Sequence, residues 1–131
     1  MAIKYLFDKE NNILYEKGEG KVTFNDFKDY RNQLSKTDLQ SGLRCFADYR
    51  NALVDLSYDN MLQIIGETQN ASKGIEDVKV AICASDDLGY GIARMYSAIN
   101  ETKEYNVNVF RTIEEACLFL GIANISKLDL E

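Results

Sequence analysis

The sequence contains no histidine and no proline, and only three of its 131 residues are cysteine. Without histidine the chain lacks the commonest general base, the commonest zinc ligand and the usual activator of a nucleophilic serine or cysteine. The lack of proline removes the residue that most strongly stiffens loops. The cysteines are widely spaced in apolar segments, so we expect them to be buried and free: Cys45, Cys83 and Cys117. We therefore expect no catalytic residues, no metal site, no cofactor and no enzymatic activity.

Long hydrophobic runs and clusters of positive charge are missing as well. No apolar segment approaches the roughly 20 residues that span a bilayer, and charge comes too early at the N-terminus for a signal peptide. The net charge is −6, and the 15 lysines and arginines are scattered, whereas nucleic acids and anionic membranes are bound by clustered cations. We predict a cytoplasmic protein that neither binds nucleic acid nor inserts into membranes.

The length and composition are those of one globular domain. Hydrophobic residues make up 46% of the chain and charged residues 27%, which is ordinary for a folded protein, and 131 residues is close to the commonest domain size. We predict a single domain over residues 1–121 and a C-terminal tail over residues 122–131.

Hydrophobic periodicity predicts five strands and four helices in the order ββαβαβαβα. Strands are expected at residues 3–7, 13–15, 45–47, 78–84 and 107–109. The first two strands form an antiparallel hairpin through the polar turn at 8–12. Helices are expected to begin after Thr23, Ser57, residues 85–87 and Thr112. The result is an α/β fold with a mixed five-stranded sheet, an N-terminal hairpin followed by βα units, and the nearly all-apolar strand 78–84 at its centre.

One candidate site opens the helix that follows strand 78–84, because ligands collect at the carboxyl ends of parallel strands. Gly89 and Gly91 imitate the start of a dinucleotide-binding fingerprint, but Arg94 stands where a third small residue is needed. The alternative is a flexible first turn from which Tyr90 and Arg94 reach over the sheet edge. The acidic pair at 86–87 is expected to cap the helix rather than to hold magnesium.

A second candidate cluster, Asp48-Tyr49-Arg50-Asn51, follows the neighbouring strand and is expected within reach of residues 85–94. Its arginine and Arg94 either pair internally with Asp48 or Asp86, or join Tyr49 and Tyr90 in a mixed polar recognition surface. Loops on a rigid scaffold commonly carry such surfaces. The candidate binding residues are Asp48, Tyr49, Arg50, Asn51, Ser85, Asp86, Asp87, Tyr90, Gly91 and Arg94.

Two segments resemble a known family: VAICASDDLGYGIARM at 80–95 and VFRTIEEACLFLG at 109–121. With the order of elements, they make residues 1–121 similar to the STAS-like domains, the fold of bacterial anti-sigma-factor antagonists, and in particular to stand-alone STAS/SEC14-like proteins. The resemblance implies a non-enzymatic regulatory or protein-interaction module, with a protein partner or a second copy of the chain.

Anti-sigma antagonists carry a phosphorylatable serine at the start of the helix after the strand that is here expected to end at Asp48. Residues 49–53 include no serine or threonine, and Ser57 comes later, so we predict a module without the phosphoserine switch. The alternative function is a small-molecule or lipid carrier or sensor. Four aromatic residues either line its pocket or simply belong to the core: Phe24, Phe27, Tyr58 and Tyr96.

Overall fold

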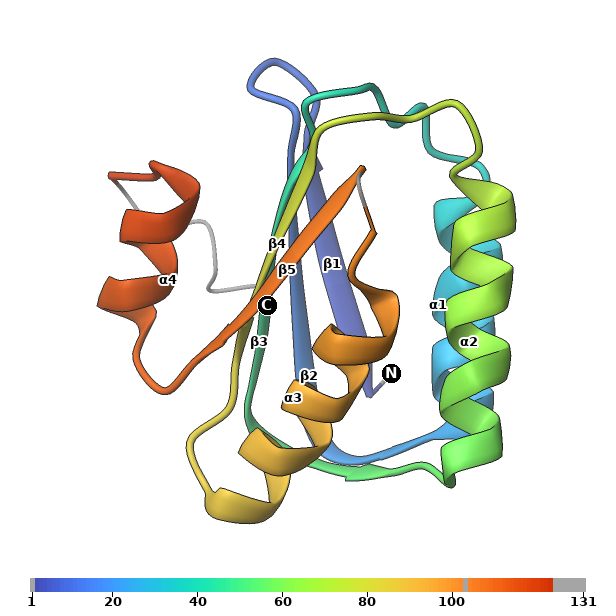
Figure 1. The fold of residues 1–131 in the computed structure, drawn as a ribbon, viewed down its shortest axis with the longest axis vertical. Coiled ribbons are helices and arrows are strands. Elements are labelled where there is room, and N and C mark those ends of the chain that lie inside the picture. The colour runs from blue at the N-terminus through green and yellow to red at the C-terminus, as the bar shows by residue number, and fades with distance from the viewer. Residues whose placement is uncertain (1, 103, 124–131) are drawn as a thin grey trace.

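The computed structural model describes residues 2–102 and 104–123 and confirms the predicted order of elements (Figure 1). Five strands form one sheet, and four helices pack against it. Their bounds are β1 Ile3–Asp8, β2 Ile13–Thr23, α1 Phe24–Leu34, β3 Arg44–Asp55, α2 Tyr58–Ala71, β4 Val78–Cys83, α3 Asp87–Asn100, β5 Tyr105–Phe110 and α4 Ile113–Leu120.

The sheet is mixed, as predicted, with the strand order β1-β2-β3-β4-β5. β1 and β2 form the antiparallel hairpin, and all later neighbours are parallel. The expectation that β4 lies at the centre is wrong, because β3 is the middle strand. An all-apolar strand needs cover on both faces, and β4 has that cover from α4 on one face and α3 on the other while lying one strand from the edge.

Strands β2 and β3 are much longer than the sequence pattern indicates. Both continue beyond the predicted ends and pair with each other from Glu19↔Asn51 to Thr23↔Asp55, after a register shift at Gly18. One face of this part of the sheet is open to solvent, and the side chains exposed on it are Glu19, Lys21, Asn51, Leu53 and Asp55. The expectation that Asp48-Asn51 forms a loop is therefore wrong, since these residues lie within β3.

The helices cover the two faces of the sheet unequally. Helices α1, α2 and α3 lie on one face and α4 lies alone on the other (Figure 1). Under α4 the core joins Phe46, Ala81 and Cys83 of the sheet to three helical residues, Ala116, Cys117 and Leu120. All three cysteines are buried and free, as predicted.

The predicted helix boundaries are largely confirmed, because the side chains expected to cap the helices do so. Thr23, Ser57, Asp86 and Thr112 each accept a hydrogen bond from the backbone N–H three residues later. Gly121 ends α4 with a φ of 70°. Ile122 still packs on the core beneath α4, and residues 124–131 of the predicted tail lie outside the described residues. Within the described part of the chain, every helix is too short or too polar to cross a bilayer.

Candidate functional site

A cavity with two lobes lies between the sheet and the three helices α1, α2 and α3 that cover one of its faces. The smaller lobe, of about 130 Å³, is lined mainly by apolar side chains from β3, β4, α2 and α3. The larger, of about 310 Å³, extends toward the C-terminal ends of α1 and α2. The smaller lobe exists because the facing positions carry small residues, namely Ala47, Ala84 and Ala93. Five residues line both lobes and so mark their junction: Glu16, Tyr30, Arg31, Val80 and Tyr96.

A carboxylate stands at this junction with three donors around it. Glu16, on β2, faces the helices. Its Oε1 accepts a hydrogen bond from Tyr30 Oη at 3.0 Å and a longer one from Cys45 Sγ at 3.6 Å. Its Oε2 accepts from Tyr49 Oη at 2.5 Å. Tyr49 is held in place by the Phe27 ring of α1, which stacks on it with the ring centroids 6.1 Å apart.

The electrostatics of this cluster follow from its burial. Burial raises the pKa of the Glu16 carboxyl, although the hydrogen bonds from Tyr49, Tyr30 and Cys45 and the charge of Arg31 oppose that rise. The pKa values of Tyr30, Cys45 and Tyr49 are raised well above their usual range, first by burial and then by the charge of Glu16. The donors therefore stay protonated at physiological pH and can hold the carboxylate.

Arg31 contributes a second charged group to the junction. Its Nε is buried and has no hydrogen-bond partner among the described residues. A buried donor without an acceptor is costly, and the guanidinium remains charged in any protein environment. The cavity therefore contains a carboxyl group whose oxygens are engaged, that of Glu16, and a guanidinium whose Nε–H has no acceptor among the described residues, that of Arg31.

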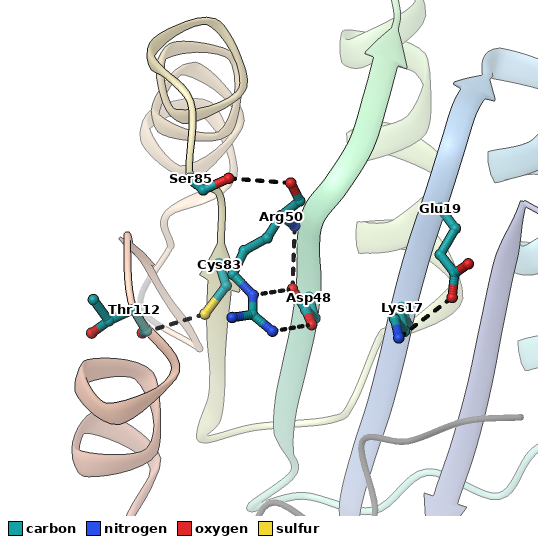
Figure 2. Close-up of polar contacts among 7 residues, drawn as sticks. All are labelled: Lys17, Glu19, Asp48, Arg50, Cys83, Ser85 and Thr112. Atoms are coloured by element: carbon teal, nitrogen blue, oxygen red, sulfur yellow. Dashed lines mark hydrogen bonds and ion pairs between the residues drawn. The ribbon is translucent and has the colours of Figure 1, made fainter.

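The predicted residues of β3 divide between the two faces of the sheet. Tyr49 faces the cavity, whereas Asp48 and Arg50 face the side of α4, because side chains alternate along a strand. Arg50 Nε and Nη2 bind Asp48 Oδ1 and Oδ2 at 2.9 and 3.0 Å (Figure 2). Asp48 raises the pKa of Arg50 through these hydrogen bonds. Internal pairing, the first of the two alternatives, is thus what the structure shows for Arg50. Asn51 is exposed on the extended part of β3.

The second predicted cluster lies beside the first, as expected. Ser85 Oγ donates to the carbonyl oxygen of Arg50 at 3.2 Å (Figure 2). Asp86 caps α3 by accepting from Gly89 N at 2.6 Å, and a Cβ on Gly89 would lie 3.0 Å from that carboxylate. Gly91 borders open space, where a Cβ would meet no described atom within 4 Å. These glycines suit a tight helix start, which is the simpler of the two alternatives for this segment.

A residue that the sequence reasoning missed completes the exposed part of this cluster. Arg111 binds Asp87 Oδ1 at 2.9 Å, and its Cζ lies 4.3 Å from the centroid of the Tyr90 ring. Arg94 Cζ lies 6.0 Å from the same ring. Tyr90 therefore has two arginines around it at the end of the sheet.

Half of the aromatic residues proposed for a pocket do line the cavity. Phe27 and Tyr96 belong to its wall, whereas Phe24 and Tyr58 do not, and Tyr58 is 56% exposed. The charged residues at the junction were not predicted. The sequence pattern that could have indicated Glu16 is a charged residue two positions after the buried Leu14, because residues two apart in a strand share a face.

Comparison with known proteins supports the fold. No protein-family description and no curated protein matches the chain. Among solved structures, an uncharacterised protein of the DUF3478 family from Shewanella loihica PV-4, which has a SpoIIAA-like fold, matches with a TM-score of 0.61 and 17% identity. The match covers 91% of this chain and 92% of that one. The chain has a SpoIIAA-like fold. This confirms the expected STAS-like architecture, and identity this low carries the fold alone.

The observed end of β3 corrects the expected position of Ser57 relative to the next helix. Because β3 runs to Asp55 instead of ending at Asp48, Ser57 is the residue that opens the next helix. It is exposed, and its hydroxyl accepts from Asn60 N at 3.0 Å. The expected strand end at Asp48 is therefore wrong, while a module without the phosphoserine switch stays a prediction.

Proposed function

We propose that the chain is a non-enzymatic regulatory module that senses or carries a small, mainly apolar molecule in the cavity beneath α1, α2 and α3. The observation that supports this most directly is the combination of an apolar lobe with two charged side chains, Glu16 and Arg31, at its inner end. Ligand sites typically join apolar walls to a few convergent polar groups in this way.

The size of the smaller lobe argues against a simple packing defect. Voids in protein interiors seldom exceed the volume of a water molecule. The smaller lobe, at about 130 Å³, is open to solvent at one side and offers roughly ten times the space that one water needs. A ligand that fills the lobe removes its apolar walls from water, and its binding to the native state therefore stabilises the fold.

Filling the lobe from within is the direct test. Ala93 of α3 lines the smaller lobe, and Ala98 on the same helix is exposed. Ala93→Leu should occupy the ligand's space, while Ala98→Leu adds the same atoms outside it. Native mass spectrometry of protein purified gently from its own host should show an added mass of roughly a few hundred daltons on the wild type and on Ala98→Leu. Ala93→Leu should lack it.

Two results together would contradict this function. One is a wild-type protein that carries no extra mass. The other is a melting temperature that 1-octanol leaves unchanged, since any molecule that binds only the native state must raise it.

A protein-interaction role is the second candidate, supported by the exposed cluster around Tyr90. This ring with Arg94, Arg111 and Asp87 presents aromatic and charged groups together, and tyrosine and arginine dominate the energetics of many interfaces. The double substitution Tyr90→Ala with Arg94→Ala should abolish capture of a partner or of a second copy in a pull-down. If every interaction survived, this surface would be the wrong one.

A further inference from the structure

We infer that the cavity takes a monocarboxylate with a hydrocarbon body, whose carboxylate accepts a hydrogen bond from Arg31 Nε while its chain fills the smaller lobe. This inference rests on the proposed ligand-binding function and assigns the chemical class of the ligand. It is carried by the unequal hydrogen bonding of the two charged groups at the junction of the lobes.

Glu16 offers little to a ligand, because its oxygens are already engaged. Tyr30, Tyr49 and Cys45 donate to them, and two of these contacts are 3.0 Å or shorter. A carboxylate has about four acceptor positions, so at most one remains for a cationic or hydroxyl-bearing ligand unless it displaces one of these donors. The junction is thus poorly suited to recognise an amine or an alcohol.

Arg31 has the opposite property. Its buried Nε–H has no acceptor among the described residues, although the side chain borders both lobes. A ligand oxygen placed there would satisfy the donor without breaking any existing hydrogen bond. Charge-assisted hydrogen bonds are about twice as strong as neutral ones, so an anionic oxygen fits this position better than an ester or amide carbonyl.

The neighbouring carboxylate limits how much negative charge the ligand can bring. Glu16 and Arg31 lie close enough for the charge of the arginine to lower the pKa of the carboxyl. Doubling the ligand's charge doubles both its attraction to Arg31 and its repulsion by Glu16, but it raises the cost of removing the head group from water more steeply, and that cost is large in a mainly apolar site. The junction therefore favours a carboxylate over a phosphate.

The lobe volumes set the length of the hydrocarbon chain. One water needs about 10–15 Å³ of such space, so the 130 Å³ lobe admits on the order of ten non-hydrogen atoms. Its walls include Ala47, Ile82, Met61, Ile64 and Ala93, which have no polar side-chain group. An eight-carbon acid is the matching probe.

The test compares four eight-carbon compounds that differ in the head group. Octanoate, 1-octanol, octylamine and octyl phosphate are titrated into the full chain at neutral pH by calorimetry. The same titrations are made with Arg31→Met, which keeps the apolar stem of the side chain and removes the guanidinium, and with Lys28→Met as the control, because Lys28 is an exposed cation on the same helix that lines neither lobe. Circular dichroism verifies that each variant is folded.

We expect octanoate to bind the wild type and Lys28→Met at least tenfold more tightly than the other three compounds. In Arg31→Met the octanoate affinity should fall at least tenfold to the level of 1-octanol, whose own affinity should not change. If Arg31→Met does not fold, Arg31→Lys retains the charge without the Nε donor and should reduce the preference for octanoate at least threefold.

The alternative outcomes are distinguishable. Equal affinities for octanoate and 1-octanol, or a preference for octanoate that survives loss of Arg31, would overturn this inference and leave the proposed ligand-binding function standing. A preference for octylamine would overturn the inference and make Glu16 the recognising group. A preference for octyl phosphate would overturn the inference that the ligand's head group is a carboxylate. No binding of any of the four compounds would overturn both the inference and the proposed function.

Discussion

Replacing Tyr49 by phenylalanine should destabilise the protein by about 2 kcal/mol at neutral pH. The substitution removes the hydroxyl that donates to Glu16 Oε2 and leaves the ring stacked on Phe27, so no cavity is created. A hydrogen bond to a charged group contributes about 1.5–3 kcal/mol. For a domain of this size that loss lowers the melting temperature by roughly 6–10 °C.

The cost of this substitution should depend on pH in a defined direction. Burial raises the pKa of Glu16 above its usual 4.5, so the native state binds this proton more tightly than the unfolded state. The contribution of Glu16 to stability is then fully present below 4.5 and is lost as pH rises through its native pKa. Tyr49 lowers that native pKa, and removing its hydroxyl raises it further. The cost of Tyr49→Phe should therefore be largest at neutral pH and shrink toward pH 4.5.

Urea unfolding followed by circular dichroism, between about pH 7.5 and about pH 4.5, measures both effects. Tyr58→Phe is the matched control, because Tyr58 is exposed and its loss of a hydroxyl should change stability by less than about 0.5 kcal/mol. In a Glu16→Gln background the substitution of Tyr49 should cost clearly less and lose its pH dependence. An equal cost in both backgrounds would refute the assignment of Tyr49 as a partner of the ionised carboxylate.

Two further predictions concern backbone positions near the sites. A Cβ at Gly18 would lie 2.5 Å from two ring carbons of Tyr49, so Gly18→Ala should destabilise by about 1–3 kcal/mol and weaken octanoate binding in calorimetry. Gly66→Ala, in α2 and clear of every described atom within 4 Å, should instead stabilise by about 0.4–1 kcal/mol in urea unfolding; a loss of stability there would contradict this reasoning. Ser57→Ala removes the cap of α2 and should cost about 1 kcal/mol. If a serine is phosphorylated in the host, peptide mapping by mass spectrometry should locate the phosphate at Ser57, which opens α2, and a phosphate on another serine would contradict this expectation.

The fold could be predicted because its signals are local. Alternating apolar residues, a capping residue before each helix and an all-apolar strand such as β4 each report on their own segment. The lengths of β2 and β3 were missed because their outer halves carry polar residues on a partly open face, where pairing with a neighbouring strand keeps the backbone extended. Such backbone pairing cannot be recognised from the pattern of hydrophobic residues in the sequence.

The cavity site could not be predicted from the chain in the same way. Glu16, Arg31, Tyr49 and Tyr96 come from β2, α1, β3 and α3, and their convergence depends on the packing of a helix layer on a sheet. Sequence reasoning favoured segments in which functional residue types lie side by side, such as Asp48-Tyr49-Arg50-Asn51. Successive side chains of a strand point to opposite faces of the sheet. Residues that are adjacent in this sequence segment therefore lie on different faces and do not form one site.

This alternation has a consequence for any regulatory role. Tyr49 lines the cavity on one face of β3, where it donates to Glu16, and Arg50 binds Asp48 on the other face. The carbonyl oxygen of Arg50 accepts a hydrogen bond from Ser85, which lies just before α3, the helix that carries Tyr90. The ligand cavity and the exposed cluster thus adjoin the same stretch of one strand. Substitutions in two independent sites contribute additively to stability, whereas sites joined through a shared element show an interaction energy. A double-mutant cycle of Tyr49→Phe and Arg94→Ala in urea unfolding measures this interaction energy, which should be absent in a carrier with an unrelated surface. A sensor additionally requires that octanoate shift the affinity of the Tyr90 surface for its partner. By linkage the partner must then shift the affinity for octanoate by the same factor.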